Sequence, residues 1–224
     1  LRSDDGGTVT GRFSYSTPNL QQVPARDPEL GPLIRGLFVP EEGCLWGAFD
    51  YSQQEPRLTV HYASLTNQPG AENAVVQYRD ENADFHQIVA DMANIPRKQA
   101  KDINLALSYG MGKKKLIQTL GISDIEAEDL IARYHQRVPF VKALADSCMR
   151  NASNRGYVTT LLGRKCRFNL FEPRGQRNIP LPYTEASEKW GEENIARSYT
   201  YKALNRLIQG SAADMTKKAM IDLY

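Results

Sequence analysis

The sequence has no long hydrophobic run, few cysteines and no large excess of charge of either sign. Its longest nearly unbroken apolar stretch is residues 43–49, whereas spanning a bilayer takes roughly 18–20 apolar residues, so we expect no membrane-spanning segment. The 28 Lys and Arg residues nearly balance the 26 Asp and Glu residues, and the net charge of +2 does not by itself indicate an anionic partner. Three widely spaced cysteines, Cys44, Cys148 and Cys166, exclude a dense disulfide framework and favour a reducing, intracellular setting.

The chain is long enough to bury a sizeable core. Its 224 residues suit one large domain or two small ones, and no repeat or low-complexity tract interrupts them. It begins at Leu1 without an initiator Met or a signal peptide, and residues 215–224 are helix-like with no stop signal. We therefore expect a fragment at both ends.

Turn signals, capping residues and apolar periodicity predict a mixed α and β chain. Residues 1–33 are rich in turn formers, and residues 45–49 have the length and composition of a buried strand that ends at Asp50. Asn67-Gln68-Pro69-Gly70 is a clear breaker and a candidate subdomain boundary. The other predicted elements are helices over 53–63, 84–93 and 96–110, a helix opened by the capping box of Ser123 and Glu126, a helix over 139–156, a strand over 157–164, a loop over 171–183, and helices over 184–204 and 205–224 with an interruption near Gly210.

A first candidate site follows the predicted strand. Asp50 ends the strand, and Glu55 stands shortly after it at the start of a helix. A carboxylate on a rigid element can hold Mg²⁺ together with phosphate oxygens. The same two residues also suit a turn and a helix N-terminus, so this pattern alone leaves both interpretations open.

A second candidate site is a stripe on the predicted helix over 96–110. Arg97, Lys101, Leu105 and Tyr109 recur every four residues and share one slowly turning face. Two cations one turn apart suit a polyphosphate, and the apolar and aromatic positions suit a sugar or base. A solvated basic edge beside a core stripe explains the same spacing at least as well.

Positive charge is concentrated in two zones of this nearly neutral chain. Residues 96–118 and 150–177 each carry a clear excess of Lys and Arg over Asp and Glu, which is enough to neutralise phosphates locally. Charge runs are usually solvated faces, but the turn-rich residues 163–167 favour an anion-contacting hairpin.

Two pairs of amides are a further candidate contact for nucleic acid. Asn205 and Gln209 lie one helical turn apart, and the small residues after Gly210 permit close approach of a backbone or a duplex. Asn19 and Gln21 form a similar pair. Amides suit minor-groove edges, which present acceptors in every base pair. The alternative is a helix whose small residues pack tightly against a sheet.

Taken together and in this order, the segments resemble the family A DNA polymerases, the DNA polymerase I-like group. The resemblance runs from about Thr10 to the last residue. The motifs that carry it are Thr10-Gly11-Arg12 with Pro18-Asn19-Leu20-Gln21 and Pro24, Asp50-Tyr51-Ser52-Gln53 with Glu55 and Arg57 (motif A), Asp84-Phe85-His86, the motif B residues Arg97, Lys101, Tyr109 and Gly110, residues 156–164, and Gln209-Gly210-Ser211-Ala212-Ala213-Asp214.

The resemblance implies an α/β fold with a right-hand polymerase architecture, in which an α+β palm joins mostly helical fingers and the thumb is absent. Residues 1–66 and 183–224 would belong to the palm, and residues 67–182 to the fingers. The implied activity is template-directed DNA synthesis with Mg²⁺, primer-template DNA and deoxynucleoside triphosphates. The implied setting is a monomer in the cytoplasm of a bacterium or of a phage-infected host.

The family's functional residues carry over position by position. Asp50 would ligate Mg²⁺ with the carbonyl of Tyr51, and Glu55 would exclude a ribose 2′-hydroxyl. Lys101 would bind the triphosphate, and we expect it to donate a proton to the leaving pyrophosphate. The other residues expected at the nucleotide are His86 and Arg97 at the triphosphate, Leu105 at the sugar and Tyr109 near the templating base. Those expected at the primer-template are Arg12, Asn19, Gln21, Asn205 and Gln209.

The chain departs from the family pattern in three places. Motif C, a His-Asp-Glu segment with the second metal-binding Asp, is missing before Tyr224, so we expect the isolated chain to be inactive. Leu105 replaces the usual Phe or Tyr, a variant associated with phage-encoded members, which predicts altered sugar discrimination. Tyr201 stands where the family commonly has an Arg, so one minor-groove contact is in question.

Two other functions compete with this interpretation. A single-subunit RNA polymerase shares the palm chemistry, but Glu55 as a sugar gate argues against it. A non-catalytic nucleic-acid-binding remnant gains support from the missing motif C if the natural gene also ends near Tyr224. A His-Asp-Glu segment in the coding frame beyond Tyr224 would favour the polymerase, and a stop codon would favour the remnant.

Overall fold

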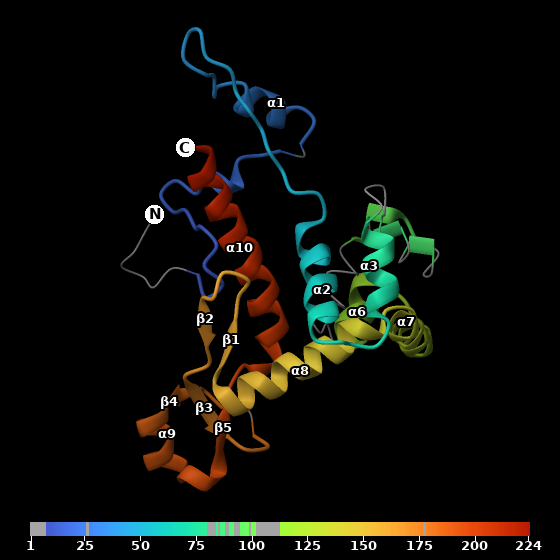
Figure 1. Cartoon of the computed structure of the whole chain (residues 1–224), viewed down its shortest axis with the longest axis vertical. Helices are drawn as coiled ribbons and strands as arrows, with labels where there is room; N and C mark the ends of the chain where they lie inside the picture. The colour runs from blue at the N-terminus through green and yellow to red at the C-terminus, as the bar shows by residue number, and fades with distance from the viewer. Residues whose placement is uncertain are drawn as a thin grey trace.

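A computed structural model describes residues 8–25, 27–79, 84, 86–87, 90–91, 95–98, 100–101, 113–176 and 178–224 (Figure 1). The helices with assigned bounds are α1 (Leu30–Arg35), α2 (Gln54–Leu65), α3 (Ala71–Arg79), α6 (Lys113–Leu120), α7 (Asp124–Arg137), α8 (Pro139–Arg155), α9 (Tyr183–Trp190) and α10 (Ala203–Leu223). The strands are β1 (Tyr157–Thr159), β2 (Lys165–Arg167), β3 (Leu170–Pro173), β4 (Leu181–Pro182) and β5 (Ile195–Arg197), and short 3₁₀ helices cover Leu20–Gln22, Glu192–Asn194 and Thr200–Lys202.

Helix α8 is the centre of the packing. It contacts α2, α7, α10 and the hairpin strand β1, and Figure 1 shows it running between the α10 side and the α3, α6 and α7 side of the molecule. Tyr134 of α7, Leu144 of α8 and Ile208 of α10 are almost completely buried in one continuous core. Burying such a side chain contributes about 1.5–3 kcal/mol, so this core fixes how α10 lies against α2.

Several predicted helix boundaries are confirmed. Helix α7 opens with the capping box, in which Ser123 and Glu126 satisfy each other's backbone N–H groups. Helix α8 has Pro139 in its first turn and ends at Gly156, whose φ of 78° is left-handed. The predicted helix over 53–63 is also confirmed by α2. Those over 84–93 and 96–110 fall largely outside the described residues.

The strands after α8 are only partly as predicted. Strands β1 and β2 form an antiparallel hairpin in which Val158 pairs with Cys166. The predicted loop over 171–183 is wrong, because it contains strand residues of β3 and β4, and β3 also pairs with β5. The single predicted helix over 184–204 is wrong as well, since α9 stops at Gly191, which has a φ of 84°. Helix α10 continues through Gly210 without the predicted interruption.

The predicted buried strand over 45–49 is wrong. Residues 44–50 are extended but pair with no described strand, and the exposed fractions of Leu45 and Phe49 are 95% and 84%. Trp46, in the same run, is 69% exposed. An apolar run forms a buried strand only where a partner covers it, and no described element covers this one. None of the described helices is long and apolar enough to cross a bilayer.

Candidate nucleic-acid and nucleotide site

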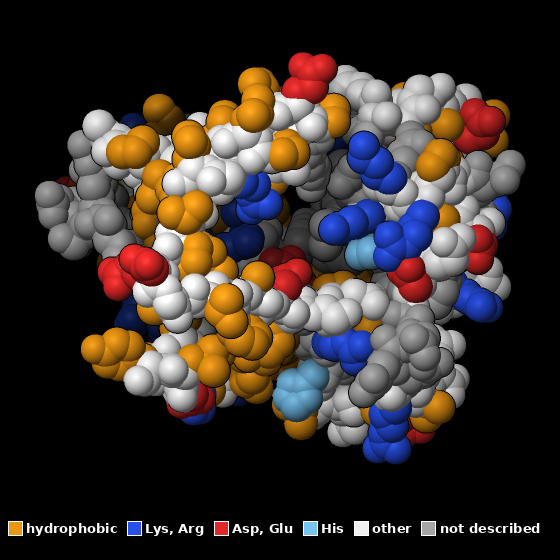
Figure 2. All heavy atoms as spheres, turned by 90° about the horizontal axis from the view of Figure 1, so that it is seen from above, with side chains coloured by type: hydrophobic (Ala, Val, Ile, Leu, Met, Phe, Trp, Pro, Cys, Tyr) orange, Lys and Arg blue, Asp and Glu red, His pale blue; other side chains and the backbone are white. Residues whose placement is uncertain are grey.

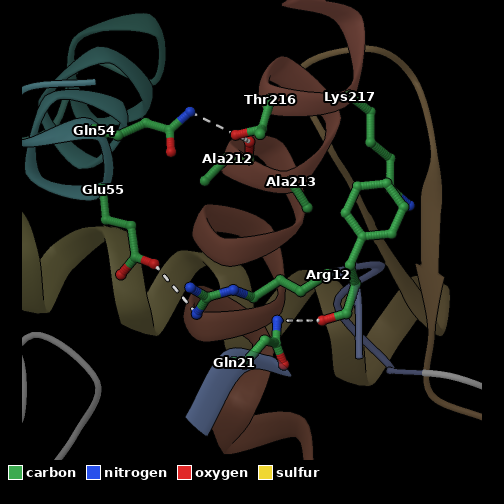
Figure 3. Close-up of a pocket in the computed structure, with 9 residues that line it drawn as sticks. Arg12, Gln21, Gln54, Glu55, Ala212, Ala213, Thr216 and Lys217 are labelled. Carbon is green, nitrogen blue, oxygen red and sulfur yellow. Dashed lines mark hydrogen bonds and ion pairs between the residues drawn. The ribbon is translucent and has the colours of Figure 1, made fainter. Parts of the chain in front are cut away.

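A pocket lies where the N-terminal segment, the start of α2 and one face of α10 meet (Figure 3). The N-terminal segment supplies Arg12 and Gln21, and the first turn of α2 supplies Glu55. These three residues were each predicted at the site. The other wall is α10, which contributes Ala212, Ala213, Thr216 and Lys217.

A small set of polar contacts holds the pocket together. Nη1 of Arg12 lies 3.9 Å from Oε1 of Glu55, and the side chains are 59% and 23% exposed. Nε2 of Gln21 donates a hydrogen bond to the carbonyl of Phe13 at 3.0 Å, and Nε2 of Gln54 donates to the carbonyl of Ala212 at 3.2 Å. Figure 3 shows Arg12 extending across the pocket towards Glu55. The pocket thus has a cation, an amide and a carboxylate on facing walls.

The amides predicted on α10 are not among the residues that line the pocket, but they precede its α10 residues on the same helix. Gln209 is one turn before Ala212 and Ala213, and Asn205 is one turn before Gln209, so all of them lie near one helix face. Both amides are half-buried. Asn19 acts differently, because its Oδ1 accepts a hydrogen bond from the backbone N–H of Gln21 at 3.1 Å and so caps a short 3₁₀ helix. It positions Gln21 rather than extending the pocket.

The predicted metal ligand Asp50 is exposed and lies at the end of the extended segment before α2. The turn between them is held by Arg57, whose Nε donates to the carbonyl of Ser52 at 3.1 Å and whose Nη1 donates to the carbonyl of Tyr78 at 2.8 Å. The carboxylate of Asp50 and the carbonyl of Tyr51 are hard oxygen donors of the kind Mg²⁺ prefers. Among the described residues, no three His, Cys, Asp or Glu side chains gather closely enough to form a complete metal site.

Two of the three predicted triphosphate residues, His86 and Arg97, contact one carboxylate, that of Asp84. Oδ1 of Asp84 accepts from the backbone N–H of His86 at 3.0 Å, and Oδ2 of Asp84 forms an ion pair with Nε of Arg97. Burial alone would raise the pKa of Asp84, but the hydrogen bonds from Arg97 and from the backbone hold that pKa below its ordinary value. His86 is 5% exposed, and Lys101 is exposed. Leu105 and Tyr109 lie outside the described residues.

One face of the molecule carries charged side chains around a hollow. Figure 2 shows Lys and Arg side chains on both sides of a hollow in the face seen from above, with acidic side chains beside them. This agrees with the expectation that local charge, and not the net charge of +2, determines which anions the chain attracts.

The β1–β2 hairpin does not present its cations as predicted. Arg164 turns inward, and its Nε donates to Oδ1 of Asp214 at 2.8 Å. Nζ of Lys165 lies over the ring of Tyr157, 4.7 Å from its centroid. The prediction of an anion-contacting hairpin is therefore wrong for Arg164, because it took no account of a buried acid far along the chain.

Sequence reasoning missed two residues of the pocket. Gln54 links α2 to α10, and Lys217 lies over the ring of Phe13, 4.7 Å from its centroid. Lys217 follows Gln209 by about two helical turns, so the face of α10 that carries the amides already contained the signal. Gln54 has no such signal, because its partner is a backbone carbonyl.

Comparison with known proteins adds the family context. The model of DNA polymerase family A matches residues 3–224. The chain is 39% identical to the DNA-directed DNA polymerase of Pseudomonas phage M6, over 96% of this chain and 35% of that protein. It is 38% identical to the thermostable DNA polymerase I of Thermus aquaticus, over 100% of this chain and 25% of that protein. The chain thus spans about a third or less of the curated relatives it matches.

A solved structure is similar as well. The POL domain of Pol1 from M. smegmatis, in complex with a DNA primer-template and dNTP, has a TM-score of 0.68 and 32% sequence identity. The match covers 96% of this chain and 35% of that one. The fold of the described elements is therefore that of part of a polymerase domain.

Proposed function

Because the chain belongs to DNA polymerase family A, we propose that it takes part in template-directed DNA synthesis, with primer-template DNA and deoxynucleoside triphosphates as substrates. The observation that carries this proposal is the pocket in which Arg12 and Gln21 meet Glu55 beside α10. Cations suit the phosphate backbone and amides suit minor-groove edges. The structural neighbour binds both kinds of ligand, which supports the assignment.

The proposed reaction is attack of a primer 3′-oxygen on the α-phosphorus of a nucleoside triphosphate, with pyrophosphate leaving. Arg97 and Lys101 offset the negative charge of the triphosphate, and Lys101 donates a proton to the leaving pyrophosphate. His86 contacts the same phosphates. Asp50 and the carbonyl of Tyr51 would hold Mg²⁺, which when bound stabilises charge on the phosphate oxygens.

In this proposal, Glu55 is the residue that discriminates between deoxyribose and ribose. Its side chain is 23% exposed at the start of α2, and in this proposal it occupies the space that a ribose 2′-hydroxyl would need and so excludes the hydroxyl sterically. Leu105 has no ring to pack against the sugar. From Glu55 we therefore assign DNA synthesis in preference to RNA synthesis. From Leu105 we assign a response to dideoxynucleotides that differs from that of family members with an aromatic residue at this position.

We further propose that residues 1–224 alone do not catalyse synthesis, since the described residues hold Asp50 without the carboxylates that would complete a two-metal site. The proposed domains remain a palm over 1–66 and 183–224 and fingers over 67–182. The proposed setting is a monomer in the cytoplasm of a bacterium or of a phage-infected host; the phage and bacterial sources of the relatives support the kind of host. Templated primer extension by the isolated chain would contradict the proposed inactivity.

The proposed function is tested in a chimera in which residues 1–224 replace the matching region of the phage M6 polymerase, called the M6 chimera below. Single-nucleotide incorporation by Lys101→Ala should fall by about a hundredfold or more, since general acid catalysis contributes at least about that factor. Lys142→Ala on α8, which loses only an exposed pair with Asp146, is the matched control and should keep the parent rate. An unchanged rate in Lys101→Ala would refute both roles of Lys101.

A non-catalytic nucleic-acid-binding remnant is the second candidate. It is favoured by the exposure of Asp50 and because the described part of the chain holds no group of three His, Cys, Asp or Glu side chains that could bind a metal ion. The coding frame beyond Tyr224 separates the two candidates, because a His-Asp-Glu segment there would favour the polymerase and a stop codon would favour the remnant.

A further inference from the structure

Arg164 joins three segments that are far apart in the sequence. It lies at the end of the β1–β2 loop, and its Nε donates to Oδ1 of Asp214 on α10 at 2.8 Å. Its Nη2 donates to the carbonyl of Thr10 at 2.8 Å and to the carbonyl of Gly210 at 3.0 Å. One guanidinium therefore fixes the hairpin, α10 and the N-terminal segment relative to one another.

Two glycines leave the space through which this guanidinium passes. A Cβ on Gly11 would lie 3.0 Å from Cζ of Arg164, and Gly11 has a φ of +79° that side chains rarely adopt. A Cβ on Gly210 would lie 3.1 Å from Nη2 of Arg164 and 2.9 Å from Cγ2 of Thr160. A larger residue in place of Gly11 or Gly210 would push the guanidinium of Arg164 aside. Both glycines are therefore needed to leave room for this one side chain.

The acid that holds Arg164 is buried and shared. Asp214 is 9% exposed, and its second oxygen accepts a hydrogen bond from the hydroxyl of Thr160. A buried carboxylate that loses its cation is strongly destabilising, which favours a permanently occupied pair. Lysine cannot replace the arginine here, because one ammonium does not reproduce the planar fork that reaches Asp214 and two carbonyls together.

The hydrogen-bond donors of Arg164 are used almost entirely within the protein, which leaves few for a ligand. Its guanidinium makes four hydrogen bonds, of which the weakest runs from Nη1 to Sγ of Cys166 at 3.5 Å. Only one of its five N–H groups remains. A direct phosphate contact is therefore not its main role.

We propose that Arg164 is a positioning residue for the primer-template, which rests on the proposed function. Arg12 follows the clamped Thr10-Gly11 pair, and Gln209 directly precedes the clamped Gly210. By fixing both carbonyls, Arg164 sets the distance between the cation of Arg12 in the pocket and the amide of Gln209, which precedes the pocket residues on α10. A duplex then meets a preformed surface and does not have to order the N-terminal segment itself.

The test is a double-mutant cycle on DNA binding, measured by fluorescence anisotropy of a labelled primer-template with the 224-residue chain. Arg12→Ala and Arg164→Lys should each weaken binding by about fivefold to tenfold. The loss of DNA affinity in the double variant should be clearly smaller than the product of the two single losses, because Arg164 acts through Arg12. Lys142→Ala, which removes an exposed charge from α8, is the control and should change affinity by less than about twofold.

A second variant covers the case in which Arg164→Lys fails to fold. Gly11→Ala crowds the guanidinium and strains the left-handed backbone at residue 11, so the midpoint of thermal unfolding should fall slightly, the chain should still fold cooperatively, and DNA binding should weaken. Independent effects of Arg164→Lys and Arg12→Ala, or no effect of either Arg164→Lys or Gly11→Ala, would overturn the inference. An Arg12→Ala chain with parent affinity would instead refute the proposed DNA contact, and the inference with it.

Discussion

The guanidinium of Arg12 lies 3.9 Å from the carboxylate of Glu55, across the pocket that also receives Gln21 and α10. One residue is expected at the primer-template and the other at the sugar of the incoming nucleotide. In the protein without DNA, the two groups partly neutralise each other. A primer that binds Arg12 must therefore draw it from Glu55, which links occupation of the primer site to the charge at the sugar gate.

This pair predicts that Glu55→Gln tightens primer-template binding. Releasing Arg12 from an exposed ion pair is worth up to about 1 kcal/mol, which corresponds to an affinity gain of up to about fivefold. Anisotropy with the labelled duplex measures it directly. Glu188→Gln on α9 removes the same charge away from the pocket and serves as the control. Weaker binding by Glu55→Gln, or an equal gain in both variants, would contradict the link.

Asp84 is predicted to hold the triphosphate residues through two separable contacts. Asp84→Asn keeps an acceptor for the backbone N–H of His86 but loses the charge that pairs with Arg97, so it should lower the urea midpoint of unfolding only slightly, because the pair is exposed. Asp84→Ala also loses the acceptor for the backbone N–H groups of His86 and Gln87 and should cost about 1 kcal/mol more. Asp146→Asn, which breaks another exposed pair, is the control.

The pH dependence of the Asp84 effect has a definite sign. The pKa of Asp84 is lowered in the folded chain, so its ion pair contributes above the ordinary titration range of a carboxyl group and is lost as the pH falls through the folded pKa. The difference in stability between the parent and Asp84→Asn should therefore be constant near neutral pH and vanish in acid. A difference that grows on acidification would contradict the assignment.

The three thiols are predicted to differ sharply in reactivity. Cys44 is exposed, whereas Cys148 and Cys166 are buried; burial raises the pKa of Cys148 to about 12 and also raises that of Cys166. Because the thiolate is the reactive form, a colorimetric thiol titration of the native chain should show one fast group, and the denatured chain should show three. Cys44→Ser should abolish the fast phase. A second fast thiol in the native chain would show that the α8 and hairpin core is not formed as described.

Local signals predicted the helices well and the strands poorly. Ser123, Pro139 and Gly156 act within a few residues of themselves, so the ends of α7 and α8 could be read from the chain. The pairing of Ile195 with Pro173 depends on a distant partner that periodicity does not reveal. Residues 45–49 show the opposite error, since an apolar pattern was present but no described strand pairs with it.

The residues of the site could be predicted from the sequence, but their arrangement in space could not. Arg12, Gln21 and Glu55 were chosen from their motifs, and the structure brings them to one pocket. The direction of Arg164 was not predictable, because its partner Asp214 lies on another element and the two glycines that admit it are recognisable only in space. The contact of Arg97 with Asp84 was missed for the same reason.

The central claim is that this chain carries a catalytic carboxylate of a DNA polymerase at Asp50. The most direct measurement is primer extension by the M6 chimera with Asp50→Asn, compared with Asp222→Asn, which loses an exposed carboxylate paired with Lys218 on α10. Loss of a metal ligand should cost several kcal/mol of transition-state stabilisation, and therefore about a thousandfold or more in rate. We predict that loss for Asp50→Asn and the parent rate for Asp222→Asn; an Asp50→Asn chimera that extends primers at the parent rate would contradict the account.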